Sequence, residues 1–320
     1  MYRSFFGMRD NPFGLTPDLR YIYWSRHHRE ALAHLLYGVQ ERKGFILLTG
    51  EVGVGKTLLC RYLLRELGEG VRTALILNPV HSADQLLRRV NQDLGLEPKP
   101  NGSEKPLDRL NASLLEEYAR GGNCVLIIDE AQTLPVGVLE QVRLISNLET
   151  EQSKLIQIVL VGQSELNGML GLHVMRQLRQ RVAVAYHLCA FDRRDTVGYI
   201  RRRLQLAAPT EPVEFTPGAM RAIHHHTGGV PRRINILCDR VLLAAYTSGR
   251  GVVDRRLVDA AAHDVRGRLA GLGPSPPRRR RGWVSGAAAR ALCSKRAAWA
   301  AATSAALATG FLVGRWWAGP

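Results

Sequence analysis

One segment constrains the fold of this chain more than any other: residues 50–57, which read GEVGVGKT. The segment has the spacing GxxxxGK[ST], follows the apolar run Phe45–Thr49, and precedes a helical pattern over Leu58–Leu67. Glycines at these positions let the backbone turn until its N–H groups face one phosphate, and the start of a helix adds a positive dipole there. We therefore expect a strand, a phosphate-binding loop and a helix in that order, rather than a glycine-rich turn without a ligand.

The residues of this loop have separate expected roles. The ammonium group of Lys56 would reach the β- and γ-phosphates, and the hydroxyl of Thr57 would ligate Mg²⁺. The loop itself serves ATP and GTP alike; no guanine-specific [NT]KxD motif is visible, and we expect ATP with Mg²⁺. The residues expected to contact the nucleotide are Gly50, Glu51, Val52, Gly53, Val54, Gly55, Lys56, Thr57 and Leu58.

A second motif follows about 70 residues later, where the apolar run Val125–Ile128 ends in two carboxylates. Asp129 is expected to hold Mg²⁺, through water, as the aspartate of a Walker-B motif does. Glu130 is placed next along the chain to orient or deprotonate the water that attacks the terminal phosphate. An apolar strand that ends in Asp-Glu is only moderately specific alone, but behind a phosphate loop it is a strong signal.

Short apolar runs alternate with helical patterns up to about residue 190, which is typical of an α/β fold with a parallel sheet covered on both faces. Residues 192–266 are predicted to be helical only. Thr216-Pro217 starts one helix with proline in its first turn, and Gly228-Gly229-Val230-Pro231 separates it from the next. The expected strands are Phe45–Thr49, Thr73–Leu77, Val125–Ile128, Ile156–Val161 and Val182–Leu188.

The C-terminal part has a different composition. Residues 269–296 contain Pro274, Pro276, Pro277 and four consecutive arginines, so we expect a linker. Residues 297–313 then run for 17 positions without a charge, and we expect a transmembrane helix over 297–317 with its basic N-terminal side in the cytoplasm. Eight of the 17 are alanine, so an alanine-rich soluble helix or a tail remains the alternative.

Composition supports a folded protein in a reducing compartment. The chain is 46% hydrophobic and 22% charged, its five cysteines lie far apart, and Met1–Asp10 lacks the apolar run of a secretory signal. Half of the +16 net charge lies after residue 270, where eight basic and no acidic residues occur, so a nucleic-acid interpretation of the whole chain is weakened. Neither His224–His226 nor His27-His28 is expected to bind metal, and the latter pair is expected at the surface.

Together these residues resemble an AAA+ ATPase, and in particular the general secretion pathway protein A (ExeA-like) family, which includes the MSHA pilus biogenesis ATPases. The resemblance covers about residues 1–265. It departs at Ser164, where the family usually has proline, and secretion-type members continue past the membrane helix into a peptidoglycan-binding domain, so we expect no direct cell-wall role here. The matching stretches are Phe5–Met8, Asn11–Phe13, the GEVGVGKT loop, Leu126–Gln132, Ser146–Thr150 and Gln157–Leu166.

The resemblance implies roles for further residues and a division into domains. Gln163 resembles the sensor-1 residue, Arg232 resembles the sensor-2 arginine of a helical lid, and Arg181 stands where the arginine finger is often placed. Arg176 and Arg179 are rivals for that last role. An arginine finger acts on ATP bound by a neighbouring subunit, so the resemblance implies a homo-oligomer, expected to be a ring. The expected domains are a nucleotide-binding α/β domain over 1–190, a lid over 191–268, the linker over 269–296 and the membrane helix.

Three functions compete at this point. The first is a membrane-anchored ATPase of the bacterial inner membrane that assists secretion, type IV pilus or exopolysaccharide proteins, with no nucleic-acid partner. The second is a DNA-associated ATPase of the transposition-helper or origin-binding type, in which the arginine run contacts phosphates. The third, a switch that binds ATP and scarcely hydrolyses it, is disfavoured by Glu130.

Overall fold

The computed structural model describes residues 2–68, 70–77, 80–97, 105–208 and 213–270. Contacts divide the chain into a unit of residues 1–268 and a second unit of residues 269–320. The fold and the site lie in the first unit. The expected linker over 269–296, apart from residues 269–270 at the end of a helix, and the expected membrane helix lie outside the described residues. Within the described part, no helix is both long enough and apolar enough to cross a bilayer.

A five-stranded parallel sheet forms the centre of the first half of the chain, in the order β2-β3-β4-β1-β5. All five strands that the apolar runs predict are confirmed within one or two residues. Because the strands are parallel, their carboxyl ends share one edge of the sheet, and the residues that follow β1, β3 and β4 meet there. The strands are β1 (Phe45–Gly50), β2 (Val71–Ile76), β3 (Asn123–Ile128), β4 (Gln157–Gly162) and β5 (Val182–Leu188).

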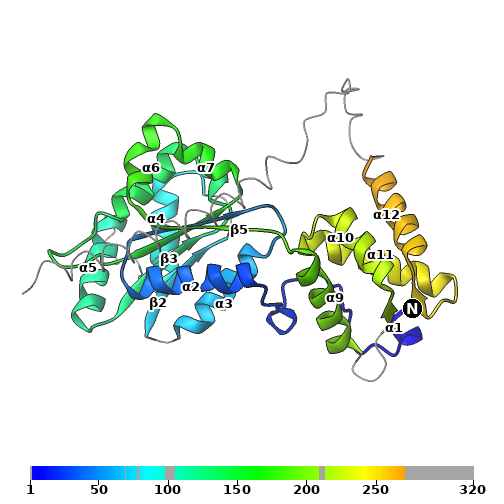
Figure 1. Ribbon diagram of the computed structural model, residues 1–320. Helices are drawn as coiled ribbons and strands as arrows, with labels where there is room; N and C mark the ends of the chain where they lie inside the picture. Colours follow the sequence, from blue (N-terminus) through cyan, green and yellow to red (C-terminus); the bar gives the residue numbers. More distant parts are fainter. Residues whose placement is uncertain (1, 69, 78–79, 98–104, 209–212, 271–320) are drawn as a thin grey trace, which may run out of the picture. The chain divides into compact units, whose positions relative to one another are not determined.

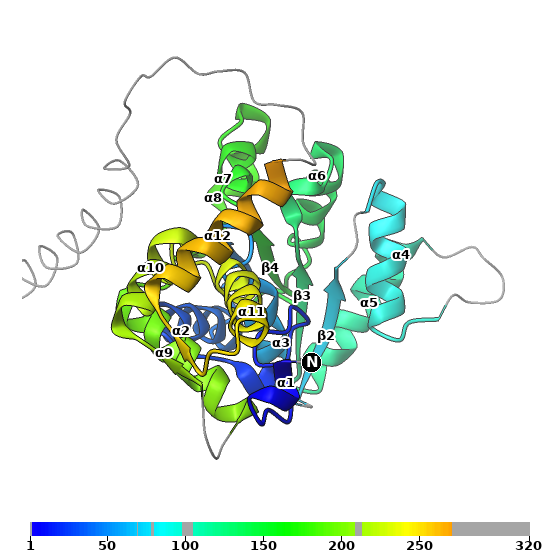
Figure 2. The ribbon, with the colours of Figure 1, turned by 90° about the vertical axis from the view of Figure 1, so that its right-hand side faces the viewer.

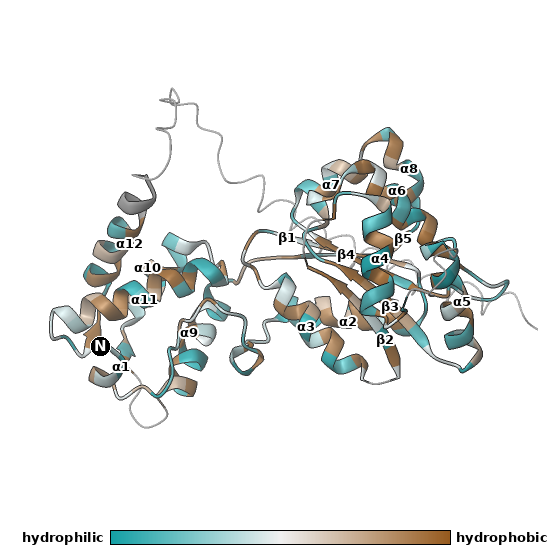
Figure 3. Cartoon of the chain, turned by 180° about the vertical axis from the view of Figure 1, so that it is seen from behind, coloured by the Kyte–Doolittle hydropathy of each residue, from teal (hydrophilic) through white to brown (hydrophobic). Residues whose placement is uncertain are grey.

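Helices cover both faces of this sheet (Figure 1). Alternate residues of β1 show the two faces: Phe45 and Leu47 belong to one apolar cluster, and Ile46 and Leu48 belong to another. The central strands β1, β3 and β4 are buried on both sides and are apolar at nearly every position, as their brown colour in Figure 3 shows. The second cluster is closed by α2 (Arg26–Gln40) and α3 (Lys56–Leu67). The first is closed by α4 (Ala83–Asp93), α5 (Pro106–Ala119), α6 (Val136–Ile145), α7 (Glu165–Leu170) and α8 (Arg176–Gln180).

The helical region that follows contains α9 (Arg193–Ala207), α10 (Pro217–Thr227), α11 (Pro231–Thr247) and α12 (Arg255–Ala270). Thr216 caps α10 and Pro217 occupies its first turn, as predicted. The prediction of helices alone was wrong, because β6 (Glu214–Phe215) pairs in parallel with β7 (Val252–Val253). Two-residue strands are too short to show an alternating pattern, so periodicity does not detect them.

The N-terminal segment packs on the helical region and not on the sheet. Met8 and Phe13 are buried in the cluster formed by α9, α10 and α11, and α1 (Tyr2–Phe5) lies beside α11 (Figure 2). Tyr2 Oη donates to Asp239 Oδ1 at 2.6 Å, and Arg203 Nη1 donates to the carbonyl of Pro12 at 2.7 Å. This packing differs from the expected division at residue 190, because the first residues share their core with the helices. Three short 3-10 helices complete the described elements: η1 (Leu19–Tyr21), η2 (Ala131–Thr133) and η3 (His173–Met175).

Candidate nucleotide site

The predicted phosphate loop lies between the end of β1 and the start of α3. Gly53 and Gly55 have φ angles of 81° and 108°, in the left-handed region that favours glycine. Gly50 needs glycine for a different reason: a Cβ there would lie 2.6 Å from the carbonyl oxygen of Leu188 on β5. These three glycines bring the loop close against the sheet and lead it into the first turn of α3, where backbone N–H groups lack intrahelical acceptors and can bind an anion.

The remaining residues of the loop divide into a buried anchor and an exposed tip. Val54 is fully buried against α2 and β5, whereas Glu51 and Val52 are exposed and Leu58 is half-buried on α3. The side chain of Val54 therefore anchors the loop in the core, while the side chains of Glu51 and Val52 face solvent.

Lys56 is buried at the base of this loop. Its ammonium group donates to the carbonyl oxygens of Gly50 at 2.8 Å and Glu51 at 3.0 Å. Burial lowers the pKa of Lys56, and the negative charges of Glu130 and Asp129 oppose that effect. A buried cation next to two carboxylates is poised to gain stabilisation from any further oxygen anion that enters the loop.

Thr57 and Asp129 face each other across the sheet edge. Thr57 Oγ1 donates to Asp129 Oδ2 at 2.5 Å, which joins the first turn of α3 to the end of β3. The backbone N–H of Asp129 donates to the carbonyl of Ile76 at 2.9 Å, so the carboxylate is fixed relative to β2 as well. A hydroxyl and a carboxylate are hard oxygen ligands, and this donor set fits Mg²⁺.

Glu130 is held in an unusual backbone conformation, with φ of 50°. Its N–H donates to Asp129 Oδ1 at 2.9 Å, and its Oε2 accepts from the side-chain amides of Gln132 at 2.5 Å and Gln163 at 3.2 Å. Burial raises the pKa of Glu130, but these two hydrogen bonds and the charge of Lys56 outweigh it, so the net shift is downward. Glu130 is therefore a carboxylate at neutral pH, oriented through one oxygen.

Gln132 is a residue of this site that sequence reasoning did not single out. It lies in η2, and its Oε1 accepts from the backbone N–H of Gln163 at 3.0 Å while its amide donates to Glu130. Gln132 thus ties the ends of β3 and β4 together. It stood inside the quoted stretch Leu126–Gln132, but nothing in its spacing indicated a contact 31 residues away.

The helical region reaches the loop through the start of α11. The backbone N–H of Arg232 donates to the carbonyl of Gly53 at 3.2 Å, and a Cβ at Gly53 would lie 2.6 Å from Arg232 Cβ. The side chain of Arg232 is exposed, and among the described residues none is hydrogen-bonded or ion-paired to it. The structure therefore brings Arg232 to the phosphate loop with an available guanidinium group.

Arg181 does not reach this site within one chain. It directly precedes β5, at the amino edge of the sheet, and its Nη1 donates to Ser146 Oγ at 3.0 Å. A six-residue strand spans about 20 Å, which separates this edge from the loop. The rivals Arg176 and Arg179 are exposed on α8, next to Arg181.

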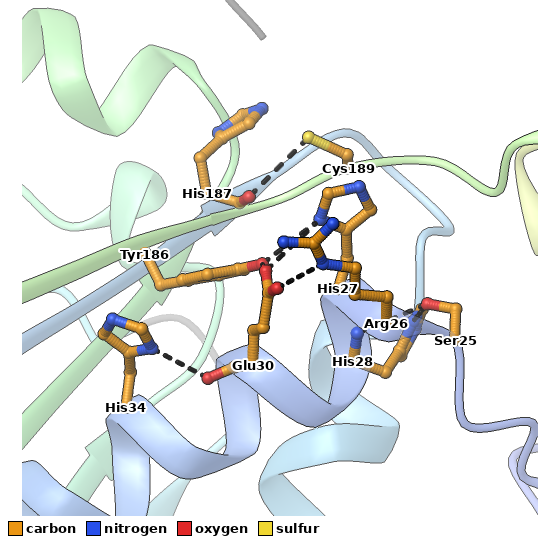
Figure 4. Close-up of polar contacts among 9 residues, drawn as sticks. All are labelled: Ser25, Arg26, His27, His28, Glu30, His34, Tyr186, His187 and Cys189. Carbon is orange, nitrogen blue, oxygen red and sulfur yellow. Dashed lines mark hydrogen bonds and ion pairs between the residues drawn. The ribbon is translucent and has the colours of Figure 1, made fainter. Parts of the chain in front are cut away.

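His28 supports the loop from α2, contrary to the prediction that it lies at the surface. Only 5% of it is exposed. Its Nε2 donates to the carbonyl of Val54 at 3.1 Å, and Nδ1 lies 2.7 Å from Ser25 Oγ, which caps α2 (Figure 4). Burial lowers the pKa of His28 to about 4, so the ring is neutral at pH 7. His27 is half-buried and lies 3.2 Å from Tyr186 Oη on β5.

Comparison with known proteins agrees with this geometry. A family model described as an AAA domain matches residues 39–170. General secretion pathway protein A of Aeromonas hydrophila is 44% identical over 268 residues, which are 83% of this chain and 49% of the relative. The chain thus spans about half the length of that relative. The chain carries an AAA domain and is related to general secretion pathway protein A over most of its length.

Solved structures show the same fold at low sequence identity. Cdc6p of Pyrobaculum aerophilum superimposes with a TM-score of 0.61 at 18% identity, over 83% of this chain and 75% of that chain. The Aeropyrum pernix ORC2 protein, solved as ADPNP and ADP complexes, gives a TM-score of 0.58 at 18% identity, over 80% and 72%. At this identity the likeness shows the fold alone.

Proposed function

We propose that this AAA-domain relative of general secretion pathway protein A binds ATP with Mg²⁺ and hydrolyses it. One observation carries the proposal: the side-chain amides of Gln132 and Gln163 both donate to Oε2 of Glu130 and so orient its carboxylate. The pKa of Glu130 is lowered, and the preceding residue, Asp129, accepts from the Thr57 hydroxyl. A chain that only needed to bind a nucleotide would not require a second oriented carboxylate at this edge.

Binding uses the loop and the start of α3. The phosphates would lie over the loop N–H groups, where Lys56 exchanges the carbonyls of Gly50 and Glu51 for phosphate oxygens. Thr57 and Asp129 would hold Mg²⁺, which when bound neutralises charge on the phosphate oxygens. Leu58 and the exposed Val52 would contact the nucleotide from the rim of the loop.

Hydrolysis depends on Glu130 and its partners. Among the described residues none donates to Glu130 Oε1, so this oxygen is available to a water molecule. A water that donates to Oε1 is oriented toward the terminal phosphorus, forms the new P–O bond as the bond to ADP breaks, and passes its proton toward the carboxylate. Gln163 keeps the carboxylate in place and would sense the terminal phosphate.

The arginines divide between two subunits. Arg232 would contact the phosphates of its own chain, because it starts α11 at the loop. Arg181 would act on ATP bound by a neighbouring subunit, because its own site lies a strand's length away, with Arg176 and Arg179 as rivals. Developing negative charge on the phosphates is stabilised by such a guanidinium. The proposal therefore includes a homo-oligomer, expected to be a ring.

We further propose that the ATPase is anchored in the bacterial inner membrane by residues 297–317, with the AAA domain in the cytoplasm, and assists secretion or pilus assembly proteins. The name of the relative from Aeromonas hydrophila supports a secretion-related process. The competing proposal is a DNA-associated ATPase, in which the arginine run Arg278–Arg281 would contact phosphates.

Two experiments test these proposals. Purified protein should release phosphate from ATP in the presence of Mg²⁺, and EDTA or Lys56→Ala should abolish turnover; phosphate release unaffected by both would contradict the site.

The membrane anchor is tested by fractionating cells and washing their membranes with high salt. Retention in the membrane supports the anchor, whereas release that rises steeply with salt supports the DNA-associated alternative.

A further inference from the structure

A groove lies on the helical region, away from the nucleotide site. Two hollows lie beside α9. The first, of about 550 Å³, is bounded by α9, β6 and α10, and the second, of about 540 Å³, is bounded by α9 and Tyr23. Both are lined by Arg193, Val197 and Arg201, so the two hollows adjoin along these residues, and together they are called the α9 groove below. The three residues are four positions apart, so they share one face of the helix.

The floor of the α9 groove is apolar and its rim is basic. Leu204, Phe215 and Met220 supply the floor, and they are 2%, 8% and 6% exposed. The rim is different in character: the exposed arginines that line it are Arg193, Arg194, Arg201 and Arg221.

These four arginines pair with no acidic side chain in the described part of the chain. Among the described residues, none forms a salt bridge or hydrogen bond with any of their guanidinium groups, although arginines elsewhere on the surface do pair, such as Arg255 with Asp259. Glu214 is the one acidic side chain that lines the groove within the described part of the chain. Four unpaired guanidinium groups around an apolar floor favour a ligand that carries carboxylates and apolar groups together.

We propose that the α9 groove binds an acidic, amphipathic segment of a partner protein. Arg193 and Arg201 lie about 12 Å apart along α9, from a rise of about 1.5 Å per residue. Carboxylates spaced by two turns of a helix match that separation, and an apolar residue between them would contact Val197 and the floor. This inference does not depend on ATP hydrolysis, because none of its residues belongs to the nucleotide site.

Two other occupants are disfavoured by chemistry. The segment 271–320 of the same chain carries eight basic and no acidic side chains, so the arginine rim repels it. Nucleic acid is attracted by arginines, but single strands are held by bases stacked on exposed aromatic faces. Two aromatic side chains line the α9 groove: Phe215 is only 8% exposed, and the half-buried ring of Tyr23 makes T-shaped contacts with Phe191 and Tyr199. Both rings are packed against the core of the helical region, so the groove fits a peptide better than a single-stranded nucleic acid.

The test uses the full-length protein and a display library of random 12-residue peptides. The library is selected in parallel on the wild type and on the double variant Arg201→Glu/Arg221→Glu. We expect the wild type alone to enrich peptides with Asp or Glu at helical spacing around an apolar residue. The dissociation constant of the best enriched peptide, measured by fluorescence anisotropy, should rise at least tenfold in Arg201→Glu.

The matched control is Arg202→Glu, which reverses a charge at the next position of α9 but does not line the groove, and it should change the constant less than twofold. Equal thermal melting of the variants establishes that each is folded. Any of the following results would overturn the proposal: no acidic class of peptide enriched on the wild type, equal losses of affinity in Arg201→Glu and Arg202→Glu, or a 20-nucleotide DNA that binds through Arg201 while no peptide does. A change of oligomeric state in Arg201→Glu would instead make this face an interface between copies, and would also overturn it.

Discussion

His28 Nε2 donates a hydrogen bond to the carbonyl of Val54, 3.1 Å away, and so connects α2 to the middle of the phosphate loop. A carbonyl only accepts, so Nε2 carries the proton, and in the neutral ring Nδ1 accepts from the Ser25 hydroxyl at 2.7 Å. The same ring lies close to Gly55, where a Cβ would approach Nε2 to 3.2 Å. The loop is thus held by two hydrogen bonds to its backbone carbonyls, one from the neutral His28 to Val54 and one from the N–H of Arg232 to Gly53.

This contact predicts a dependence of stability on pH. The pKa of His28 is lowered from 6.5 to about 4 by burial. Below pH 6.5 the unfolded chain binds a proton that the folded chain does not take up until about pH 4, so the free energy of unfolding falls as the pH drops through this window. At about 1.4 kcal/mol per pKa unit, the loss between pH 7.5 and pH 4.5 is roughly 2–3 kcal/mol.

Urea unfolding at the two pH values measures this loss. His28→Gln keeps a side-chain donor but does not titrate, so its loss between pH 7.5 and 4.5 should be smaller than that of the wild type by roughly 2–3 kcal/mol. His34→Gln is the control, because His34 is exposed on the same helix. If the wild type and His28→Gln lose the same free energy, His28 is not buried in the neutral form.

Two adjacent glycines between α10 and α11 give a matched steric test. Gly228 and Gly229 both have positive φ, 61° and 75°, but a Cβ at Gly228 meets nothing within 4 Å, whereas one at Gly229 would lie 1.9 Å from the carbonyl oxygen of Phe191. Gly228→Ala should cost about 1 kcal/mol from backbone strain alone. Gly229→Ala should cost several kcal/mol, because backbone must move. Urea unfolding of the two variants decides this, and equal costs would contradict the close approach.

The parallel sheet and the loop could be predicted because their signals are local. Strands buried on both faces form nearly continuous apolar runs, and the spacing of Gly50, Gly55 and Lys56 is specific to a phosphate-binding loop. Asp129 and Glu130 were found because they are the first two residues after such a strand. The residues that contact these two carboxylates could not be predicted from local sequence, because Gln132 meets Gln163 only once β3 and β4 are paired.

The errors have the same physical origin. His28 was expected at the surface because a histidine beside another histidine carries no signal of burial, and only the packing of α2 under the loop encloses it. The strands β6 and β7 were missed because two residues show no period. Nothing in the sequence around Met8 and Phe13 indicates which core they join, and both are buried with the helices that follow residue 190.

Mixing of variants tests the proposed action of Arg181 across a subunit boundary. Lys56→Ala lacks a working loop but keeps its arginine, and Arg181→Ala keeps its loop but lacks the arginine. Each alone should show little hydrolysis, and mixed oligomers should regain part of it because one interface combines an intact loop with an intact arginine. No recovery in protein that demonstrably co-assembles would move the role to Arg176 or Arg179.

The expected membrane helix can be tested by one charge. Ala306 lies near the middle of the uncharged run, and Ala306→Arg should cost about 2.5–3.5 kcal/mol of insertion free energy. The run is rich in alanine and only marginally apolar, so this cost should release the protein from the membrane fraction. A chain cut after Arg268, where the first unit ends, should also be released and still hydrolyse ATP. Retention of Ala306→Arg after a high-salt wash would contradict the span.

The central claim is that Glu130 activates water while Lys56, Thr57 and Asp129 bind the nucleotide, and Glu130→Gln separates these roles most directly. The amide has nearly the same shape but cannot take up a proton, so ATP affinity should stay within about threefold of the wild type, which is less than 1 kcal/mol, while steady-state hydrolysis falls at least a hundredfold. Lys56→Ala should lose affinity itself. The measurement is ATP affinity and turnover on the same preparation of Glu130→Gln: tight binding without turnover is the predicted result, and turnover like that of the wild type would contradict the account.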